Sequence, residues 1–192
     1  MKAININNKL DEEEEFESKI LEISADNYRD IIVNILWWVE KNKVSMTAVW
    51  MKNKITWHKI RIREEWNNVV IEEKRKIETV EKNIKWATEI KHKNKWKTFI
   101  EEVILWETDW YIQLNKSVKT RISFILENWV KIEFDKYSDL DWMEIPEFAE
   151  IESTKYEEIL ETAKLLWFNE NALKNWNAWE LASYYKDKFA IN

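Results

Sequence analysis

The stretch VKTRISFILENWVKIEFD, residues 118–135, contains two runs in which apolar and polar side chains alternate. Such alternation is typical of a β-strand that buries one face. The stretch therefore predicts an antiparallel hairpin that turns at Asn128 and Trp129. A tight hairpin turn needs positive φ at its central residues, which Asn-Gly supplies and an indole side chain opposes. Trp129 is the residue that does not fit the hairpin.

Tryptophan stands in this chain where glycine is normally found. The 192 residues include 14 Trp and no Gly, although average usage of roughly 7% would give about 13 Gly. Several Trp occupy turn-like positions or end a helical pattern, where left-handed backbone is expected: Trp37, Trp66, Trp110, Trp129, Trp142, Trp167 and Trp176. One explanation is a source genome that decodes UGA as glycine, translated with a table that reads UGA as Trp. The alternative is a genuinely Trp-rich chain with aromatic stacking surfaces.

Composition limits the kinds of protein that this chain can be. The net charge is −6 and 34% of the residues are charged, so a general polyanion-binding surface is not implied. The absence of Cys excludes disulfides and thiolate metal sites, and His58 and His92 leave little for a zinc site. Any bound metal is expected to be a hard cation held by carboxylates. Neither an apolar signal region nor a membrane-spanning run is present, so we expect a soluble cytoplasmic protein.

Strand-like and helix-like segments alternate without a linker, which predicts a single α+β domain over residues 1–192. Alternating runs predict strands at residues 15–23, 44–49, 58–64, 68–77, 87–92, 111–114, 118–126, 130–137 and 147–153. Helical spacing predicts helices at residues 26–36, 97–106, 154–166 and 177–189, with N-caps near Asp26 and Thr154. Pro146 is expected between strands, where its missing N–H does least harm.

One face of six predicted strands carries charged side chains in pairs or triplets. Side chains alternate across a strand, so residues two apart share a face. The charged faces carry Glu15, Glu17 and Lys19; Arg61 and Arg63; Glu72, Lys74 and Lys76; Lys119 and Arg121 with Ser123; Lys131, Glu133 and Asp135; and Glu150 and Glu152. For any single strand, the simplest interpretation is the solvated outer face of an antiparallel sheet.

The signs of these charges sort by strand. Carboxylates dominate the first and last strands, and cations dominate the middle ones. A barrel with its charged faces inward would set acidic and basic walls around one channel. That arrangement is too costly to desolvate unless water, metal ions and an anionic ligand fill it. A polyphosphate suits both walls, because its oxygens accept from Arg and Lys while carboxylates hold divalent ions that bridge the phosphates.

The order of these motifs resembles that of the CYTH domains, the triphosphate tunnel metalloenzymes. EFESK at residues 15–19 matches their ExExK signature, and IRIRE at residues 60–64 is similar to their arginine strand. A strand that ends in Lys74, a basic strand at residues 119–121 and an acidic strand at residues 149–152 follow in the same order. The resemblance covers about residues 12–190, and it improves where Trp is read as Gly.

The resemblance implies an eight-stranded antiparallel β-barrel that forms a tunnel, with helices packed on the outside. It implies Mg²⁺ or Mn²⁺ as the cofactor, bound by Glu15, Glu17, Glu150 and Glu152. It implies phosphate binding by Lys19, Arg61, Arg63, Lys74, Lys76, Lys119 and Arg121, and catalytic roles for Lys19, Glu133 and Asp135. Two features depart from the family: residues 39–57 match its second strand poorly, and Glu72 stands where the family often has Thr.

The function that the resemblance implies is metal-dependent hydrolysis of a triphosphate, either inorganic tripolyphosphate or an organic triphosphate such as thiamine triphosphate. The first alternative is a class IV adenylyl cyclase, which would hold a ribose between the same walls and make cyclic AMP from ATP. The second alternative is a non-catalytic polyphosphate-binding module. Stacking of nucleic-acid bases on genuine Trp is disfavoured by the acidic net charge. We expect a small-molecule substrate, no nucleic-acid or membrane partner, and a monomer or homodimer.

Overall fold

The computed structural model describes residues 11–35, 38–40, 43–65, 68–81, 84–94, 97–125, 130–140 and 142–190. In this part of the chain the long strands are β1 (Asp11–Ile20), β3 (Val44–Asn53), β4 (Lys59–Glu65), β5 (Asn68–Glu81), β6 (Ile84–Asn94), β7 (Tyr111–Ile125), β8 (Lys131–Leu140) and β9 (Met143–Ser153). The two-residue strands β2 (Val39–Glu40) and β10 (Leu173–Lys174) extend the sheet. The helices are α1 (Ala25–Asp30), α2 (Phe99–Thr108), α3 (Tyr156–Leu165) and α4 (Ala178–Ala190), with a π-helical turn η1 (Ile31–Ile35) and a 3₁₀ turn η2 (Glu170–Ala172).

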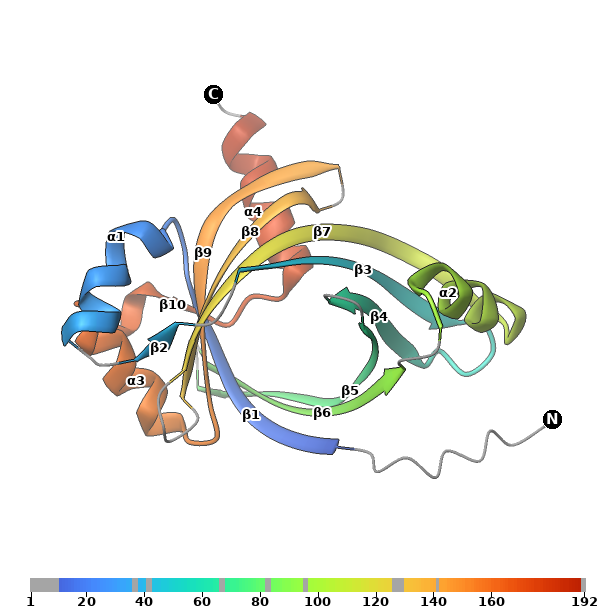
Figure 1. The fold of residues 1–192 in the computed structure, drawn as a ribbon, viewed down its shortest axis with the longest axis horizontal. Helices are drawn as coiled ribbons and strands as arrows, with labels where there is room; N and C mark the ends of the chain where they lie inside the picture. The colour runs from blue at the N-terminus through green and yellow to red at the C-terminus, as the bar shows by residue number, and fades with distance from the viewer. Residues whose placement is uncertain are drawn as a thin grey trace.

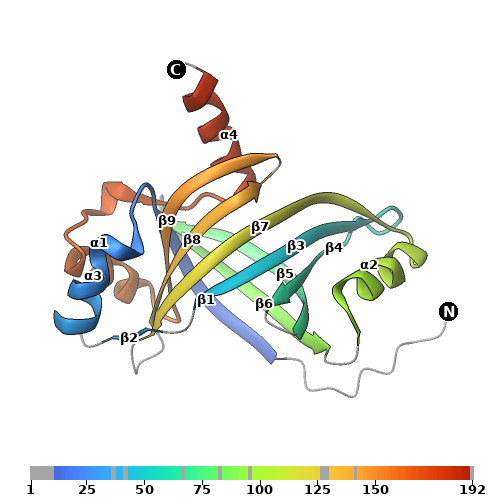
Figure 2. The same ribbon diagram turned by 45° about the horizontal axis from the view of Figure 1, so that its top comes forward.

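All the described strand pairings are antiparallel, in the order β10-β1-β6-β5-β4-β3-β7-β8-β9. β1 pairs with β6 through residues 11–17 and also with β9 through residues 16–20, so the path of pairings returns to β1. In Figures 1 and 2 the long strands β3 and β7 arch across from β1, β5 and β6. The expected α+β fold, an antiparallel tunnel built from eight long strands, is confirmed, and α1, α2 and α3 pack on its outside.

Most of the apolar core lies between the strands and the helices, on the outer face of the sheet. Phe124, Phe134 and Ile151 project from neighbouring strands into a buried cluster that includes Ile159 of α3. A second cluster joins β3 and β4 to α2 (Figure 1). Because successive side chains point to opposite faces, the outward packing of these two clusters turns the charged residues of the same strands inward. A third cluster joins β8 and β9 to α4 on the inner face, where Tyr137, Phe148 and Leu181 line the internal cavity. No helix in the described ranges is both long and apolar enough to cross a membrane.

The helices begin close to the predicted positions, but two N-caps differ. α1 is capped by Ser24, whose hydroxyl accepts from the backbone N–H of Asp26, so the predicted cap at Asp26 is wrong by two residues. The N-cap position of α3 is Lys155, one residue beyond the predicted Thr154, and its side chain makes no capping hydrogen bond. Local spacing fixes a helix to within about a turn, but it does not decide which polar residue takes the cap.

Three strands differ from their sequence patterns. Separate strands were expected at residues 111–114 and 118–126, and residues 111–125 form the single 15-residue strand β7, while residue 126 lies outside the described residues. The strand predicted at residues 44–49 extends to Asn53 as β3, with a register shift against β7 between Trp50 and Met51, in the part of the chain that matches the family pattern poorly. Pro146 lies inside β9 and not between strands. The β8–β9 register shifts beside it, and a register shift is where a missing N–H is tolerated.

Four of the five described residues with positive φ are tryptophans. Trp57, Trp110, Trp142 and Trp167 have φ between 63° and 69°, and their side chains are 64–94% exposed. The fifth residue is Glu22. The predicted strain at Trp110 and Trp142 and the left-handed helix end at Trp167 are therefore confirmed, whereas Trp176 is not among the positive-φ residues. Trp37, Trp66 and Trp129, with the predicted turn at residues 128–129, lie outside the described residues.

Candidate active site

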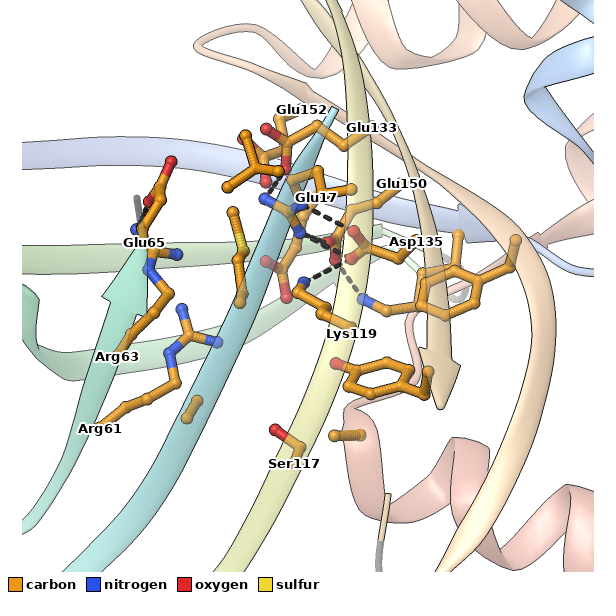
Figure 3. A pocket seen from close by; sticks show the side chains of 18 of the residues that line it. Glu17, Arg61, Arg63, Glu65, Ser117, Lys119, Glu133, Asp135, Glu150 and Glu152 are labelled. Carbon is orange, nitrogen blue, oxygen red and sulfur yellow. Dashed lines mark hydrogen bonds and ion pairs between the residues drawn. The ribbon is translucent and has the colours of Figure 1, made fainter. Parts of the chain in front are cut away.

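The inward faces of the strands enclose a cavity of about 270 Å³ that is lined by charged side chains (Figure 3). The carboxylates along it are Glu17, Glu65, Glu133, Asp135, Glu150 and Glu152. The cations along it are Lys19, Arg61, Arg63, Lys91, Lys119, Arg121 and Lys131. Both signs of charge therefore face one space, as the sorting of charges along the sequence predicts.

Cross-strand register sets the order of the side chains at the β1–β9–β8 side of the cavity. Glu17 on β1 lies opposite Glu152 on β9. One pleat further along, Lys19 lies opposite Glu150, and Glu150 lies opposite Glu133 on β8. Opposed residues in an antiparallel pair have neighbouring side chains on the same face. Acidic residues far apart in the sequence are brought together in this way.

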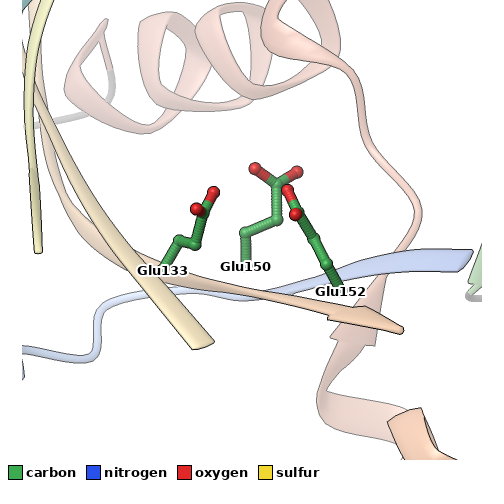
Figure 4. Close-up of side chains that lie close together, drawn as sticks. All are labelled: Glu133, Glu150 and Glu152. Atoms are coloured by element: carbon green, nitrogen blue, oxygen red, sulfur yellow. The ribbon is translucent and has the colours of Figure 1, made fainter. Parts of the chain in front are cut away.

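Glu133, Glu150 and Glu152 form a carboxylate trio on β8 and β9 (Figure 4). One oxygen of each side chain lies within 4.8 Å of the others. Arg121 Nη2 lies 3.3 Å from Glu150 Oε2, and Lys19 also contacts Glu150. Burial by itself would raise the pKa of Glu150, but Lys19 and Arg121 lower it, so this carboxyl is ionised at neutral pH. Grouped carboxylate oxygens fit a hard divalent cation such as Mg²⁺ or Mn²⁺.

Asp135 on β8 is bound to two cations of β7. Its side chain is 1% exposed, and it accepts from Arg121 Nε and Nη2, each at 2.7 Å, and from Lys119 Nζ at 2.5 Å. Burial would raise the pKa of Asp135, but the charges of Arg121 and Lys119 outweigh burial and lower it. Burial would lower the pKa of Arg121, yet Asp135 raises it well above its usual value. The three side chains thus form one hydrogen-bonded unit.

Arg61 and Arg63, the arginine pair, extend from β4 on the opposite wall (Figure 3). Both guanidiniums contact the carboxylate of Glu72 on β5, with 2.9 Å between Arg63 Nη2 and Glu72 Oε1. Arg63 Nη2 also lies 3.2 Å from Glu65 Oε2, and the Cζ of Arg61 lies 5.2 Å from the ring centre of Trp50. These contacts hold both guanidiniums at the cavity wall.

The structure brings most of the predicted site residues into the one cavity. Lys19, Glu17, Arg61, Arg63, Lys119, Arg121, Glu133, Asp135, Glu150 and Glu152 all line it. Glu15 is buried on the face of Glu17 but lies further along β1, opposite Ala87 of β6, and it is not among the lining residues. The side chains of Lys74 and Lys76 on β5 lie outside the described part, so their predicted roles stay predictions.

Three charged lining residues, Glu65, Lys91 and Lys131, were not predicted as site residues, although the sequence placed Lys131 on a charged strand face. Glu65 continues the alternation of Arg61 and Arg63 along β4, so the same spacing that identified the arginines could have found it. Lys91 lies on β6, whose pattern at residues 87–92 is weak, and it reaches the site because the β5–β6 register sets it opposite Glu72. No local signal in the sequence gives that register.

Comparison with known proteins finds structures with the same fold but no matching sequence family. No family model matches the chain, and no curated protein matches it. Solved structures do. A protein from Pyrococcus horikoshii OT3 matches with a TM-score of 0.68 and 16% identity, over 87% of this chain and 98% of that one. A candidate adenylate cyclase from Vibrio parahaemolyticus matches with a TM-score of 0.62 and 13% identity, over 88% and 97%.

A third match is to a candidate adenylyl cyclase from Hippeastrum in which triphosphatase activity dominates. The TM-score is 0.56 at 12% identity, over 78% of this chain and 84% of that one. These neighbours include CYTH-type proteins, so the resemblance seen in the sequence is confirmed at the level of the fold. At such identities the likeness defines the tunnel architecture, and the chemistry has to be argued from the cavity.

Acid is expected to destabilise the protein through the buried carboxylates. The pKa values of Asp135 and Glu150 are lowered in the folded chain. Their contribution to stability is therefore fully present above the unfolded values of about 4, and it is lost as the pH falls toward the lower folded values. Urea midpoints measured between about pH 2 and pH 6 should show this loss. Asp135→Asn should flatten the dependence of the urea midpoint on pH. Glu144→Gln, which changes an exposed carboxylate, should leave that dependence unchanged. The same pH dependence in the parent and both variants would contradict this expectation.

Proposed function

We propose that this chain is a divalent-metal-dependent hydrolase of triphosphates, with inorganic tripolyphosphate or an organic triphosphate bound along the cavity. The observation that carries the proposal is that the carboxylate trio and the cationic side chains of β4 and β7 face one cavity. The fold shared with the Hippeastrum protein, in which triphosphatase activity dominates, supports it.

The cations of three strands are placed to bind the phosphate chain. Lys19, Arg121 and Lys119 stand beside the acidic residues, and the arginine pair stands across the cavity. Charge-assisted hydrogen bonds from Arg and Lys to phosphate oxygens are among the strongest that a protein makes. Lys74 and Lys76 of β5 are predicted to add to this wall. Glu72, Asp135 and Glu150 already accept from these cations, so the ligand has to share donors with them.

Glu17, Glu150 and Glu152, with Glu133 beside them, are the residues that would hold Mg²⁺ or Mn²⁺, and Glu15 is predicted to support them. When bound, the ion would supply positive charge for the phosphate oxygens and a water of lowered pKa. The donor set fits, because it consists of carboxylate oxygens and contains no thiolate or imidazole.

Glu133 is better placed than Asp135 to orient the attacking water. The Asp135 oxygens accept three hydrogen bonds from Lys119 and Arg121, which leaves them as anchors for those cations. Glu133 also contacts Arg121, through Oε2, but it belongs to the carboxylate trio, and its Oε1 is 3.3 Å from the hydroxyl of Ser123. Lys19 lies against Glu150, where its charge can offset negative charge that develops on a leaving phosphate oxygen.

Cavity size favours hydrolysis over cyclisation. A volume of about 270 Å³ lies just below the roughly 300–1,000 Å³ of sites for drug-sized ligands, so it suits a phosphate chain better than a whole nucleotide. An adenylyl cyclase must also hold the ribose so that its 3′-hydroxyl attacks the α-phosphorus. The cyclase alternative is supported by the names of the Vibrio and Hippeastrum neighbours.

A substrate panel tests the proposed reaction. Tripolyphosphate, thiamine triphosphate and ATP are each incubated with the protein and Mg²⁺ or Mn²⁺, and both orthophosphate and cyclic AMP are measured. We expect metal-dependent release of orthophosphate that chelation abolishes. Cyclic AMP without orthophosphate would establish the cyclase instead. Tight tripolyphosphate binding without turnover would establish a polyphosphate-binding module.

Arg63→Ala is expected to weaken substrate binding more than it slows the chemical step. A charge-assisted contact contributes roughly 1.5–3 kcal/mol, so the KM for tripolyphosphate should rise about ten- to hundredfold. Lys59→Ala removes an exposed cation from the same strand and should leave KM within about twofold. Steady-state kinetics of the two variants make the comparison. An equal rise of KM in Arg63→Ala and Lys59→Ala would show that the cations of β4 act only through their overall charge.

We also infer that Trp57, Trp110, Trp142 and Trp167 correspond to glycines in the protein as its source cell makes it. Left-handed backbone is disfavoured for a bulky L-residue by roughly 1–2 kcal/mol, and glycine adopts it readily. All four indoles are exposed, so packing offers little compensation for the strain. Decoding of UGA as glycine accounts for these positions and for the absence of Gly from the whole sequence.

A further inference from the structure

Glu72 is a carboxylate in the middle of the wall that we assign to phosphate binding. It is 1% exposed and lies directly opposite Arg61 in the β4–β5 register. Its Oε1 is 2.9 Å from Arg63 Nη2, and its Oε2 accepts from Arg61 Nε and contacts Arg61 Nη2. One buried carboxylate therefore holds both members of the arginine pair.

This contact limits what the arginine pair can offer a ligand. A guanidinium binds phosphate through parallel N–H donors, and Glu72 occupies a donor of Arg61 and forms an ion pair with Arg63. A negative charge in a poorly solvated position also repels an incoming phosphate more strongly than an exposed one does. Lys91 on β6 lies opposite Glu72 and lines the same cavity, so the wall keeps a positive balance.

Resting on the proposed function, we propose that Glu72 is a positioning residue that sets the affinity of the tunnel for phosphate. It fixes the two guanidiniums at the wall and offsets part of their charge. The first effect lowers the entropy lost when a phosphate chain is bound in its reactive position. The second effect weakens ground-state binding of substrate and of the orthophosphate product, which lets the product leave.

Glu72→Gln separates these effects, because it keeps size and hydrogen-bonding capacity but removes the charge. Calorimetry without divalent metal should show Kd values for tripolyphosphate and orthophosphate about tenfold lower than those of the parent. With metal, both KM and kcat should fall, since binding tightens while the guanidiniums are held less firmly. A merely structural role for Glu72 would lower the amount of folded protein without tightening Kd.

Two further variants control the result. Glu73→Gln makes the same chemical change at the next residue of β5, whose side chain contacts His58 and does not line the cavity, and it should leave Kd within about twofold. Glu72→Asp keeps the charge but shortens the reach to the arginine pair. It should leave Kd near the parent value and lower kcat.

The outcomes distinguish this inference from the proposed function. If the parent binds tripolyphosphate and Glu72→Gln binds it no more tightly, the role of Glu72 is overturned and the proposed function stands. A tenfold tightening in Glu72→Asp would also overturn it, because the charge is still present. If the parent binds no tripolyphosphate at all, the proposed function fails and the inference fails with it.

Discussion

Replacing Glu17 with Gln is expected to reduce metal-dependent hydrolysis of tripolyphosphate by about a hundredfold or more. Glu17 lies opposite Glu152, so the substitution removes one negative charge from the carboxylates that would hold the metal. A metal ion contributes several kcal/mol of charge stabilisation to such a reaction, and about 1.4 kcal/mol corresponds to a factor of ten. Initial rates at saturating Mg²⁺ measure the loss, and added metal should restore little of it.

Binding of Mn²⁺, measured by calorimetry without substrate, gives a second readout of the same variant. It should weaken in Glu17→Gln and stay unchanged in Glu144→Gln, which alters an exposed carboxylate on the outer side of β9. Both variants should melt near the parent temperature. A Glu17→Gln protein that hydrolyses tripolyphosphate within a few-fold of the parent would remove the metal role from the EFESK strand.

Replacing Trp57, Trp110, Trp142 and Trp167 together with Gly is expected to raise the melting temperature by roughly 10 °C. Relief of left-handed strain should exceed the added entropy of the unfolded chain by about 1 kcal/mol at each site. For a domain of this size, about 1 kcal/mol corresponds to roughly 2–4 °C. Calorimetric or circular-dichroism melting of the two proteins measures the change.

Trp106→Gly is the matched control for these four positions. Trp106 lies within α2, and its ring packs 4.8 Å from that of Tyr111, so its loss should lower the melting temperature. If the fourfold variant also melts lower than the parent, the exposed indoles contribute to stability and the glycine inference is wrong. Peptide masses of the protein isolated from its source cell would give an independent answer at each position.

The strand faces could be predicted from the sequence because alternation is a local property. Spacing alone placed Arg61 with Arg63 and Glu150 with Glu152, and these pairs do share the cavity. Similarly, the helical pattern at residues 97–106 predicted α2, which has the capping box between Thr98 and Glu101. Features that depend on a few neighbouring residues could therefore be predicted without the structure.

Features that depend on the register between strands distant in the sequence could not be predicted from local spacing. The sequence offered Glu133 and Asp135 as equivalent carboxylates, and their different roles follow from the partners that β7 and β9 bring to each. The β7–β8 register sets Glu133 opposite Ser123 and Asp135 opposite Arg121, and the β8–β9 register sets Glu133 opposite Glu150. The contact of Glu72 with Arg63 likewise depends on the β4–β5 pairing. A one-residue slip would turn every side chain to the other face, so register cannot be inferred from alternation alone.

The location of a bound divalent ion and phosphate chain in the cavity tests the central claim most directly. Crystals grown with Mn²⁺ and a non-hydrolysable triphosphate analogue would show the ion by its anomalous scattering. The account predicts Mn²⁺ coordinated by Glu150 and Glu152 with Glu17 beside them, and phosphate oxygens in contact with Arg121 and the arginine pair. Mn²⁺ bound on the outer surface, or an analogue bound away from the cavity that these residues line, would contradict it.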